Sequence, residues 1–161
     1  MAERWFLKID GIAGESTDAA HKGEVDVVSW SWGVSRSAGP GSGGGGGAGK
    51  AAFDDLHFVS RIGAASPPLL LACATGSHIK EATLSGARGA GKSKSVDFLK
   101  YQLSDVTVTN VQQFDDESQV PTEQFSLNYS KIEVTYRPQT TSGKVGSPVR
   151  FGFDVKANKK I

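Results

Sequence analysis

The most specific chemical pattern in the chain is Gly86 to Ser93, with the sequence GARGAGKS. It matches G-x-x-x-x-G-K-[ST], in which backbone N–H groups, Lys92 and the Ser93 hydroxyl would bind the phosphates and magnesium of a nucleotide. That chemistry needs a buried parallel strand before the loop and a helix N-terminus after it. Residues 81–85 and 96–103 instead alternate apolar and polar side chains, as antiparallel strands do. We interpret the motif as a glycine-rich hairpin turn, with nucleotide binding as the alternative.

The remaining reactive residue types do not form a catalytic or metal-binding pattern. His21, His57 and His78 lack the helical i, i+4 spacing of a zinc pair, and a zinc site needs three or four ligands. The closest acid and histidine on one predicted strand face are Asp55 and His57. We expect all three histidines at the surface or at an interface. No G-x-S-x-G elbow presents a serine nucleophile.

Two further groups have a plain structural interpretation. Cys73 lies within an apolar helical run, where a small buried hydrophobic residue is expected in preference to a reactive thiol. The carboxylates of residues 115–117 fall in a predicted loop, for which we favour a solvated loop over a calcium site.

Composition limits the class of protein. The 161 residues suit a single domain over 1–161, with 38% hydrophobic and 22% charged residues. The net charge of +1 gives no reason to expect nucleic acid or an anionic membrane as a partner. The start of the chain lacks a secretory signal, and no apolar run approaches a membrane span. With Cys73 as the one cysteine, folding in a reducing cytoplasm is expected.

The elements that must position any site are mostly strands. Residues 25–33 (VDVVSWSWG) form a two-faced strand, because successive side chains alternate between faces. One face is expected to turn inward with Val28, Trp30 and Trp32, and the other outward with Val27, Ser29 and Ser31. Together with three other aromatic positions along the chain, this strand supplies the predicted core anchors, which are Trp5, Trp30, Trp32, Phe151 and Phe153.

The rest of the chain follows the same alternation. One short helix is predicted in SPPLLLACATG, with Ser66 as its cap, Pro67 in the first turn and Gly76 as a left-handed C-terminal cap. The apolar parity changes face near Ser130, which predicts a bulge or a bend between sheets. Several short strands with one helix predict an antiparallel barrel or sandwich.

Longer segments carry a family resemblance. FLKIDGIAGESTD, WSWG, the glycine loop ending in GK, DLHFVSRIGAASPPLLLACATGSHIKEATL, PTEQFSLNYSKIEVTYRPQ and FGFDVKANKK follow one another along nearly the whole chain. In this order they resemble the haemolysin-coregulated protein family, the tube subunit of bacterial type VI secretion.

The resemblance implies a mainly β fold: a compact antiparallel β-barrel of two sheets, one short flanking α-helix and a long extended loop. It implies homohexameric rings that stack into a hollow tube, with effector proteins in the lumen and a spike protein and contractile sheath as further partners. No enzymatic activity, cofactor or metal is expected. The protein would be cytoplasmic before assembly and then be secreted to the extracellular space or a target cell without a cleaved signal peptide.

The resemblance also assigns surfaces. Ser29 and Ser31 are expected to face the lumen and contact effectors, whereas the residues alone favour an ordinary solvent face. The loop from Ser35 to Lys50 is expected to reach a neighbouring ring, the alternative being a loop without a role. Its predicted stacking residues are Arg36, Ser37, Gly39, Pro40, Gly41, Gly45, Gly49 and Lys50. A monomeric ligand-binding β-barrel is the other alternative function.

Overall fold

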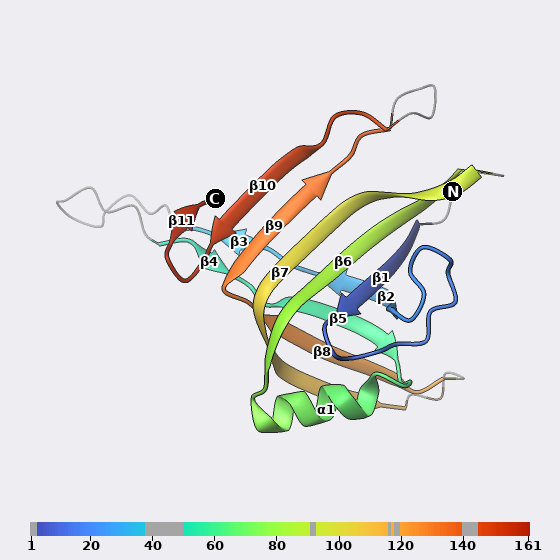
Figure 1. The fold of residues 1–161 in the computed structure, drawn as a ribbon. Coiled ribbons are helices and arrows are strands. Elements are labelled where there is room, and N and C mark those ends of the chain that lie inside the picture. Colours follow the sequence, from blue (N-terminus) through green and yellow to red (C-terminus); the bar gives the residue numbers. More distant parts are fainter. Residues whose placement is uncertain (1–2, 38–49, 91–92, 116, 118–119, 140–144) are drawn as a thin grey trace.

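The computed structural model describes residues 3–37, 50–90, 93–115, 117, 120–139 and 145–161. In this part of the chain a single helix accompanies eleven strands (Figure 1). The elements are β1 (Glu3–Ile9), β2 (Val25–Ser31), β3 (Val34–Ser35), β4 (Ala52–Phe53), β5 (Leu56–Arg61), α1 (Ser66–Thr75), β6 (His78–Ala90), β7 (Ser93–Phe114), β8 (Thr122–Asn128), β9 (Lys131–Tyr136), β10 (Val149–Asp154) and β11 (Lys159–Lys160).

The large sheet closes on itself. Its nine strands lie in the antiparallel order β11-β10-β9-β7-β6-β1-β2-β5-β8, and β8 also pairs with β7. β7 can serve both partners because its first half pairs with β9 and its second half pairs with β8. Asp105, with a φ of 53°, lies between the two halves. The predicted antiparallel barrel is thereby confirmed, and β9, β10 and β11 form a branch outside the closed circle of strands.

The core is built from the inward faces of these strands. Leu7, Phe58 and Phe125 are at most 1% exposed, and the rings of Phe58 and Phe125 stack with centroids 5.1 Å apart. Each such side chain stabilises the fold by roughly 2–3 kcal/mol through the apolar area it removes from water. Leu69 of α1 is fully buried in the same cluster, so the helix closes one side of the barrel.

The helix ends as predicted but begins differently. Gly76 adopts a φ of 65°, and backbone N–H groups of the cap reach the carbonyls of Ala72 and Cys73, which confirms the left-handed C-terminal cap. Ser66 is the first helical residue and not the cap, which is Ala65. The Ser66 hydroxyl donates instead to Oε1 of Glu123 at 3.1 Å, so it joins the helix to β8. Cys73 is partly buried and packs against the core.

Strand β2 contains an irregularity that the alternation did not predict. Its register against β5 shifts between Val27 and Ser29. Val27 is therefore buried and Val28 is 59% exposed, so the expectation that Val28 shares the tryptophan face is wrong. A bulge adds one residue to a strand and so exchanges the two faces beyond it.

The change of face predicted near Ser130 is confirmed. β8 ends at Asn128 and β9 begins at Lys131, and the chain passes between them from the β5 side of the barrel to the β10 side. The N–H group of Ser130 donates to the carbonyl of Ser104, which fixes the bend against β7.

Candidate functional site

The face that carries Ser29 and Ser31 is a polar surface shared by four strands. Ser31 of β2 lies beside His57 of β5, which lies beside Ser126 of β8, and Ser126 pairs with Asn110 of β7. Ser29 and Ser31 are both exposed, on the face that the sequence predicts for them. Adjacent strands place such side chains about 4.8 Å apart, so they form one continuous row.

A shallow hollow of about 300 Å³ follows this row, and we call it the serine hollow. His57 Nδ1 lies 2.6 Å from the Ser126 hydroxyl, so this histidine contacts a serine and not Asp55. Asp55 instead accepts hydrogen bonds from Thr109 and Asn128. Among the described residues, no Asp, Glu, Lys or Arg side chain lines the hollow. Its lining residues are Ser29, Trp30, Ser31, His57, Phe58, Val59, Asn110, Gln124, Phe125 and Ser126. The surface offers hydrogen bonds without a fixed charge.

The three tryptophans are partly buried and pack against the core, on the inner side of the strand that carries Ser29 and Ser31. The ring of Trp30 meets the ring of Trp5 edge-on with centroids 5.0 Å apart, and it lies 4.9 Å from the ring of Tyr101. Edge-to-face pairs of this kind add to the stabilisation from buried area. The indoles therefore support the strand from which Ser29 and Ser31 project.

The C-terminal aromatic positions depart from the predicted core. Phe153 is partly buried and stacks on Phe53 with centroids 4.9 Å apart, but Phe151 is 42% exposed. The reason is topological, because β10 lies on the branch outside the closed barrel. Phe151 is thus not a core anchor of the single subunit.

Phe151 belongs to an exposed apolar strip on β9 and β10. Val149 is 64% exposed and pairs with Tyr136, which is 41% exposed; Phe151 follows two residues later on the same face. We call Tyr136, Val149 and Phe151 the apolar strip. In the described chain β11 pairs with the last two residues of β10 and the Ile161 N–H group donates to the Gly152 carbonyl, so the edge from Val149 to Phe151 has no partner strand. An apolar face beside an open edge is a surface that another chain can cover.

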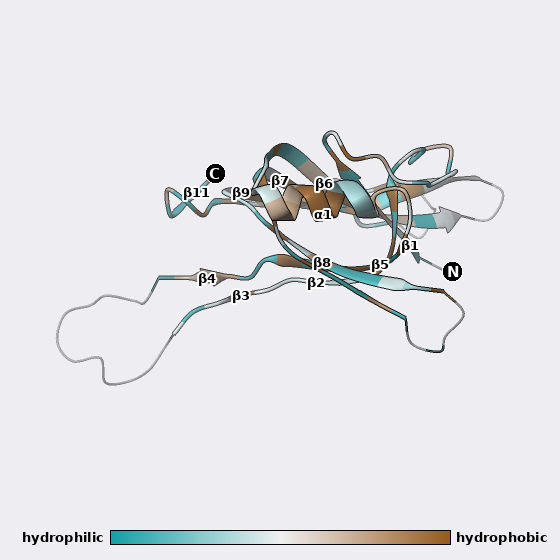
Figure 2. Cartoon of the chain, turned by 90° about the horizontal axis from the view of Figure 1, so that it is seen from below, coloured by the Kyte–Doolittle hydropathy of each residue, from teal (hydrophilic) through white to brown (hydrophobic). Residues whose placement is uncertain are grey.

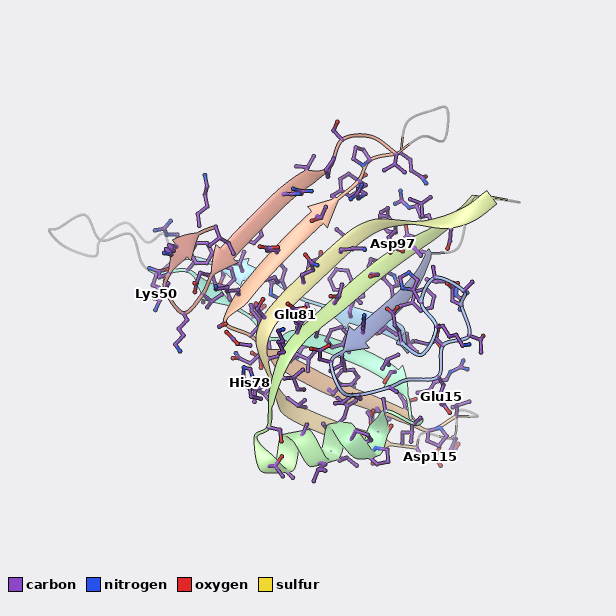
Figure 3. The ribbon with its side chains drawn as sticks, viewed as in Figure 1. Glu15, Lys50, His78, Glu81, Asp97 and Asp115 are labelled. Carbon is purple, nitrogen blue, oxygen red and sulfur yellow. The ribbon has the colours of Figure 1, made fainter. Side chains whose placement is uncertain are left out.

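A short ribbon projects from the barrel beside the serine hollow. β3 and β4 pair with each other as a separate two-stranded sheet and extend away from the rest of the molecule (Figure 2). Lys50 lies on this side, where β4 begins (Figure 3). Arg36, Ser37 and Lys50 are exposed. The other predicted stacking residues, Gly39, Pro40, Gly41, Gly45 and Gly49, lie outside the described residues.

The root of the ribbon is held by one hydroxyl group. The indole N–H of Trp32, just after β2, donates to the Tyr129 hydroxyl oxygen at 2.6 Å. The Tyr129 hydroxyl donates in turn to the backbone carbonyl of Asp54, just before β5, at 2.7 Å. Burial raises the pKa of Tyr129 to about 12; the Trp32 hydrogen bond opposes this rise, and the charges of Asp55 and Asp54 add to it. The hydroxyl therefore keeps its proton at neutral pH.

The burial of one histidine was not predicted from the sequence. His21 is 4% exposed, so the expectation of a surface or interface position is wrong for this residue. Its ring stacks on Phe6, and its two nitrogens meet the carboxylates of Glu24 and Asp97. Glu24 at i+3 was visible in the sequence, but Asp97 comes from a distant strand, near the hairpin end of β7 (Figure 3).

The nucleotide motif forms a hairpin. β6 continues through Gly86 to Ala90 and β7 begins at Ser93, and the two strands are antiparallel. The residues after Ser93 are strand and not helix, so the helix N-terminus that phosphate binding requires is lacking. Gly86 also has a packing role: a Cβ atom there would lie 2.5 Å from the Trp5 ring. Lys92 lies outside the described residues.

In the described part of the chain, no group of three or more His, Cys, Asp and Glu side chains is arranged so that it could hold a metal ion. Within the same residues, no helix has the length and apolar character needed to cross a membrane.

Comparison with known proteins gives consistent matches. The family described as "Type VI secretion system effector, Hcp" matches residues 6–136. Protein hcp1 of Pseudomonas aeruginosa is 44% identical over 160 residues, covering 98% of each chain. The crystal structure of Hcp1 from Salmonella typhimurium superposes with a TM-score of 0.83 at 36% identity, covering 100% of both chains. The structure of a type six secretion system protein superposes with a TM-score of 0.90 at 29% identity, over 99% of this chain and 100% of that one.

Proposed function

The chain belongs to the Hcp family of type VI secretion system proteins, and from this we propose that it is a subunit of the inner tube of that system. In this role it forms homohexameric rings, the rings stack into a hollow tube, and the tube carries effector proteins out of the cell. The contractile sheath and the spike protein are its further partners. The role is structural and includes no catalytic step.

The observation that carries the proposal is the apolar strip. A closed ring needs a heterologous interface, in which each subunit meets its neighbour with two different surfaces. Val149 and Phe151 are 64% and 42% exposed, beside an edge of β10 that has no partner strand in the described chain. Burying these side chains against a neighbour removes apolar area from water and satisfies the free edge.

The serine hollow supports the assignment of the lumen wall. Ser29, Ser31 and their neighbours present hydroxyl, amide and imidazole groups, and no charged Lys, Arg, Asp or Glu side chain lines the hollow among the described residues. A wall of this kind holds a folded cargo through weak hydrogen bonds and does not trap it by charge. Repetition around a ring multiplies such weak contacts.

Native mass tests the ring. Size-exclusion chromatography with light scattering should give six times the 17.0 kDa subunit mass, and electron microscopy should show rings that stack into tubes at high protein concentration. A mass of one subunit at every concentration would contradict the proposal and favour the monomeric ligand-binding barrel.

A second experiment tests the lumen wall. In Ser31→Tyr a large side chain enters the serine hollow without touching the core. We expect rings of unchanged mass that retain less effector protein when purified from the native host. Ala74→Tyr, at an exposed position of α1, is the matched control and should retain effectors as the wild type does. Loss of the ring in Ser31→Tyr would show that this face belongs to an interface between subunits.

A further inference from the structure

We propose that Tyr129 is a positioning residue that fixes the direction of the β3–β4 ribbon and thereby the contact between stacked rings. The stacking part of this inference rests on the proposed tube function. The part that concerns the ribbon rests on hydrogen bonds within one subunit, so the two can be tested separately.

The ribbon has little intrinsic means of holding a direction. β3 and β4 contain two residues each, paired as Val34 with Phe53 and Ser35 with Ala52. A two-stranded ribbon alone is at best marginally stable in water. One further backbone bond, from the N–H of Asp54 to the carbonyl of Gly33 at 3.0 Å, closes its base. Its orientation must therefore come from the place where it joins the barrel.

Tyr129 occupies that place. Trp32 precedes the outgoing strand of the ribbon and Asp54 follows the returning strand, and the Tyr129 hydroxyl bonds to both, at 2.6 and 2.7 Å. One oxygen can do this because a tyrosine hydroxyl accepts and donates at the same time. Both distances indicate close hydrogen-bonding contact, and the O–H···O distance of 2.7 Å is the usual one for its type.

Tyr129 itself is firmly fixed. Its side chain is 5% exposed and belongs to the core cluster. It lies in the bend between β8 and β9, where the adjacent Ser130 is bonded to the carbonyl of Ser104 on β7. The hydroxyl is therefore a fixed point of the barrel, and the ribbon takes its direction from that point.

Other contacts at the root are softer. The rings of Phe53 and Phe153 stack with centroids 4.9 Å apart, and the rings of Trp32 and Phe53 are 6.4 Å apart. These apolar contacts favour the ribbon lying over β10 but tolerate sliding, because they are not directional. Hydrogen bonds restrict the angle as well as the distance.

Tyr129→Phe tests the inference, with Tyr101→Phe as the matched control. Both side chains are buried aromatics, but no hydrogen bond of the Tyr101 hydroxyl to the described residues is found. Tyr129→Phe should leave the ring mass unchanged and speed amide hydrogen exchange of the ribbon, at Ser35, Ala52 and Asp54, by roughly fivefold to tenfold. Tubes should be fewer and shorter by electron microscopy. Tyr101→Phe should match the wild type in ribbon exchange and in tube growth.

Each outcome is decisive for one part of the inference. Unchanged ribbon exchange in Tyr129→Phe would overturn the positioning role. Faster ribbon exchange with tubes of normal number and length would support the positioning role and overturn its effect on stacking. A wild-type chain that forms rings but never tubes would remove the proposed stacking function itself, while the exchange measurement still decides the role of Tyr129. Should Tyr129→Phe fail to fold, Trp32→Phe removes the indole donor from the other side of the same contact and is expected to give the same ribbon result.

Discussion

The Nε2 atom of His21 lies 2.8 Å from Oδ1 of Asp97, although 76 positions separate the two residues in the sequence. The other ring nitrogen, Nδ1, lies 3.0 Å from Oε2 of Glu24. A neutral imidazole carries only one N–H group, so both contacts are hydrogen bonds only when the ring is protonated. The protonated ring therefore joins the loop between β1 and β2 to β7 through two hydrogen bonds.

The contact of His21 with Glu24 and Asp97 predicts a loss of stability at alkaline pH. Burial alone lowers the pKa of His21, but hydrogen bonds and charges, first of Asp97 and then of Glu24, outweigh it and raise the pKa above the ordinary 6.5. Because the folded pKa is the higher one, the stabilisation is fully present below about pH 6.5 and disappears as pH rises through the folded value. Thermal unfolding from about pH 6 to about pH 9 should show this loss in the wild type and not in His21→Gln.

His78→Gln is the control for the pH experiment. His78 also contacts a carboxylate, that of Asp105, but its side chain is 64% exposed. The stability of His78→Gln should change with pH as the stability of the wild type does. If the thermal stability of the wild type and of His21→Gln changed with pH in the same way, the stabilising role of protonated His21 would be contradicted.

Gly86→Ala should destabilise the protein by about 1–3 kcal/mol, since an added Cβ atom is forced against the Trp5 ring and must displace it. Gly89→Ala is the matched control from the same motif, because a Cβ atom there meets nothing within 4 Å. Urea unfolding of both variants measures the difference. Equal stabilities would show that Trp5 moves aside without cost.

Magnesium and ATP at millimolar concentration should not shift the melting temperature. Binding to the folded state alone would raise it, but Gly86 to Ala90 end one strand, Ser93 begins its antiparallel partner, and the residues after Ser93 are strand. A rise that disappears in Lys92→Ala would restore the nucleotide-binding alternative.

Glu123→Ala should cost about 2–3 kcal/mol, because two donors lose a buried acceptor. Glu123 is 1% exposed and accepts from the Gln113 amide at 2.7 Å and from the Ser66 hydroxyl at 3.1 Å. Glu133→Ala, at an exposed position of β9, should change the free energy of unfolding by less than about 0.5 kcal/mol. A Glu123→Ala variant as stable as Glu133→Ala would mean that the start of α1 does not depend on this carboxylate.

Phe151→Ser should weaken the ring by roughly tenfold or more in the subunit concentration needed for assembly, because interface energy concentrates in a few apolar anchors. The subunit itself should remain folded, since the side chain is 42% exposed. Leu71→Ser, at a 64% exposed position of α1, controls for loss of a surface apolar group. Measuring the native mass of each variant over a range of protein concentrations gives the concentration at which its rings assemble. Equal ring stability in both variants would exclude the apolar strip from the interface.

Much of the fold could be predicted because alternation and turn chemistry are local. The hairpin at residues 86–93, the Gly76 cap and the change of face near Ser130 all follow from short-range patterns. The bulge in β2 could not be predicted, because Val27 and Val28 are both apolar and either could face inward. In the structure the bulge places Val27 inside and Val28 outside. Two neighbouring valines give no sign of this change of face.

The site was harder to predict, because it depends on what covers each face. The aromatic alternation of β10 gives the face on which Phe151 lies, but not that β10 lies outside the closed barrel. The same limit applies to His21, whose partner Asp97 is brought near by the pairing of β1 with β6 and of β6 with β7.

The 22-residue strand β7 has a mechanical consequence. It runs from the branch that carries the apolar strip to the strands that carry the serine hollow, and its two halves meet at Asp105, whose φ is 53°. In the proposed ring, a load applied by a neighbour at β10 would pass through β9 to the first half of β7 and reach the serine hollow through this residue.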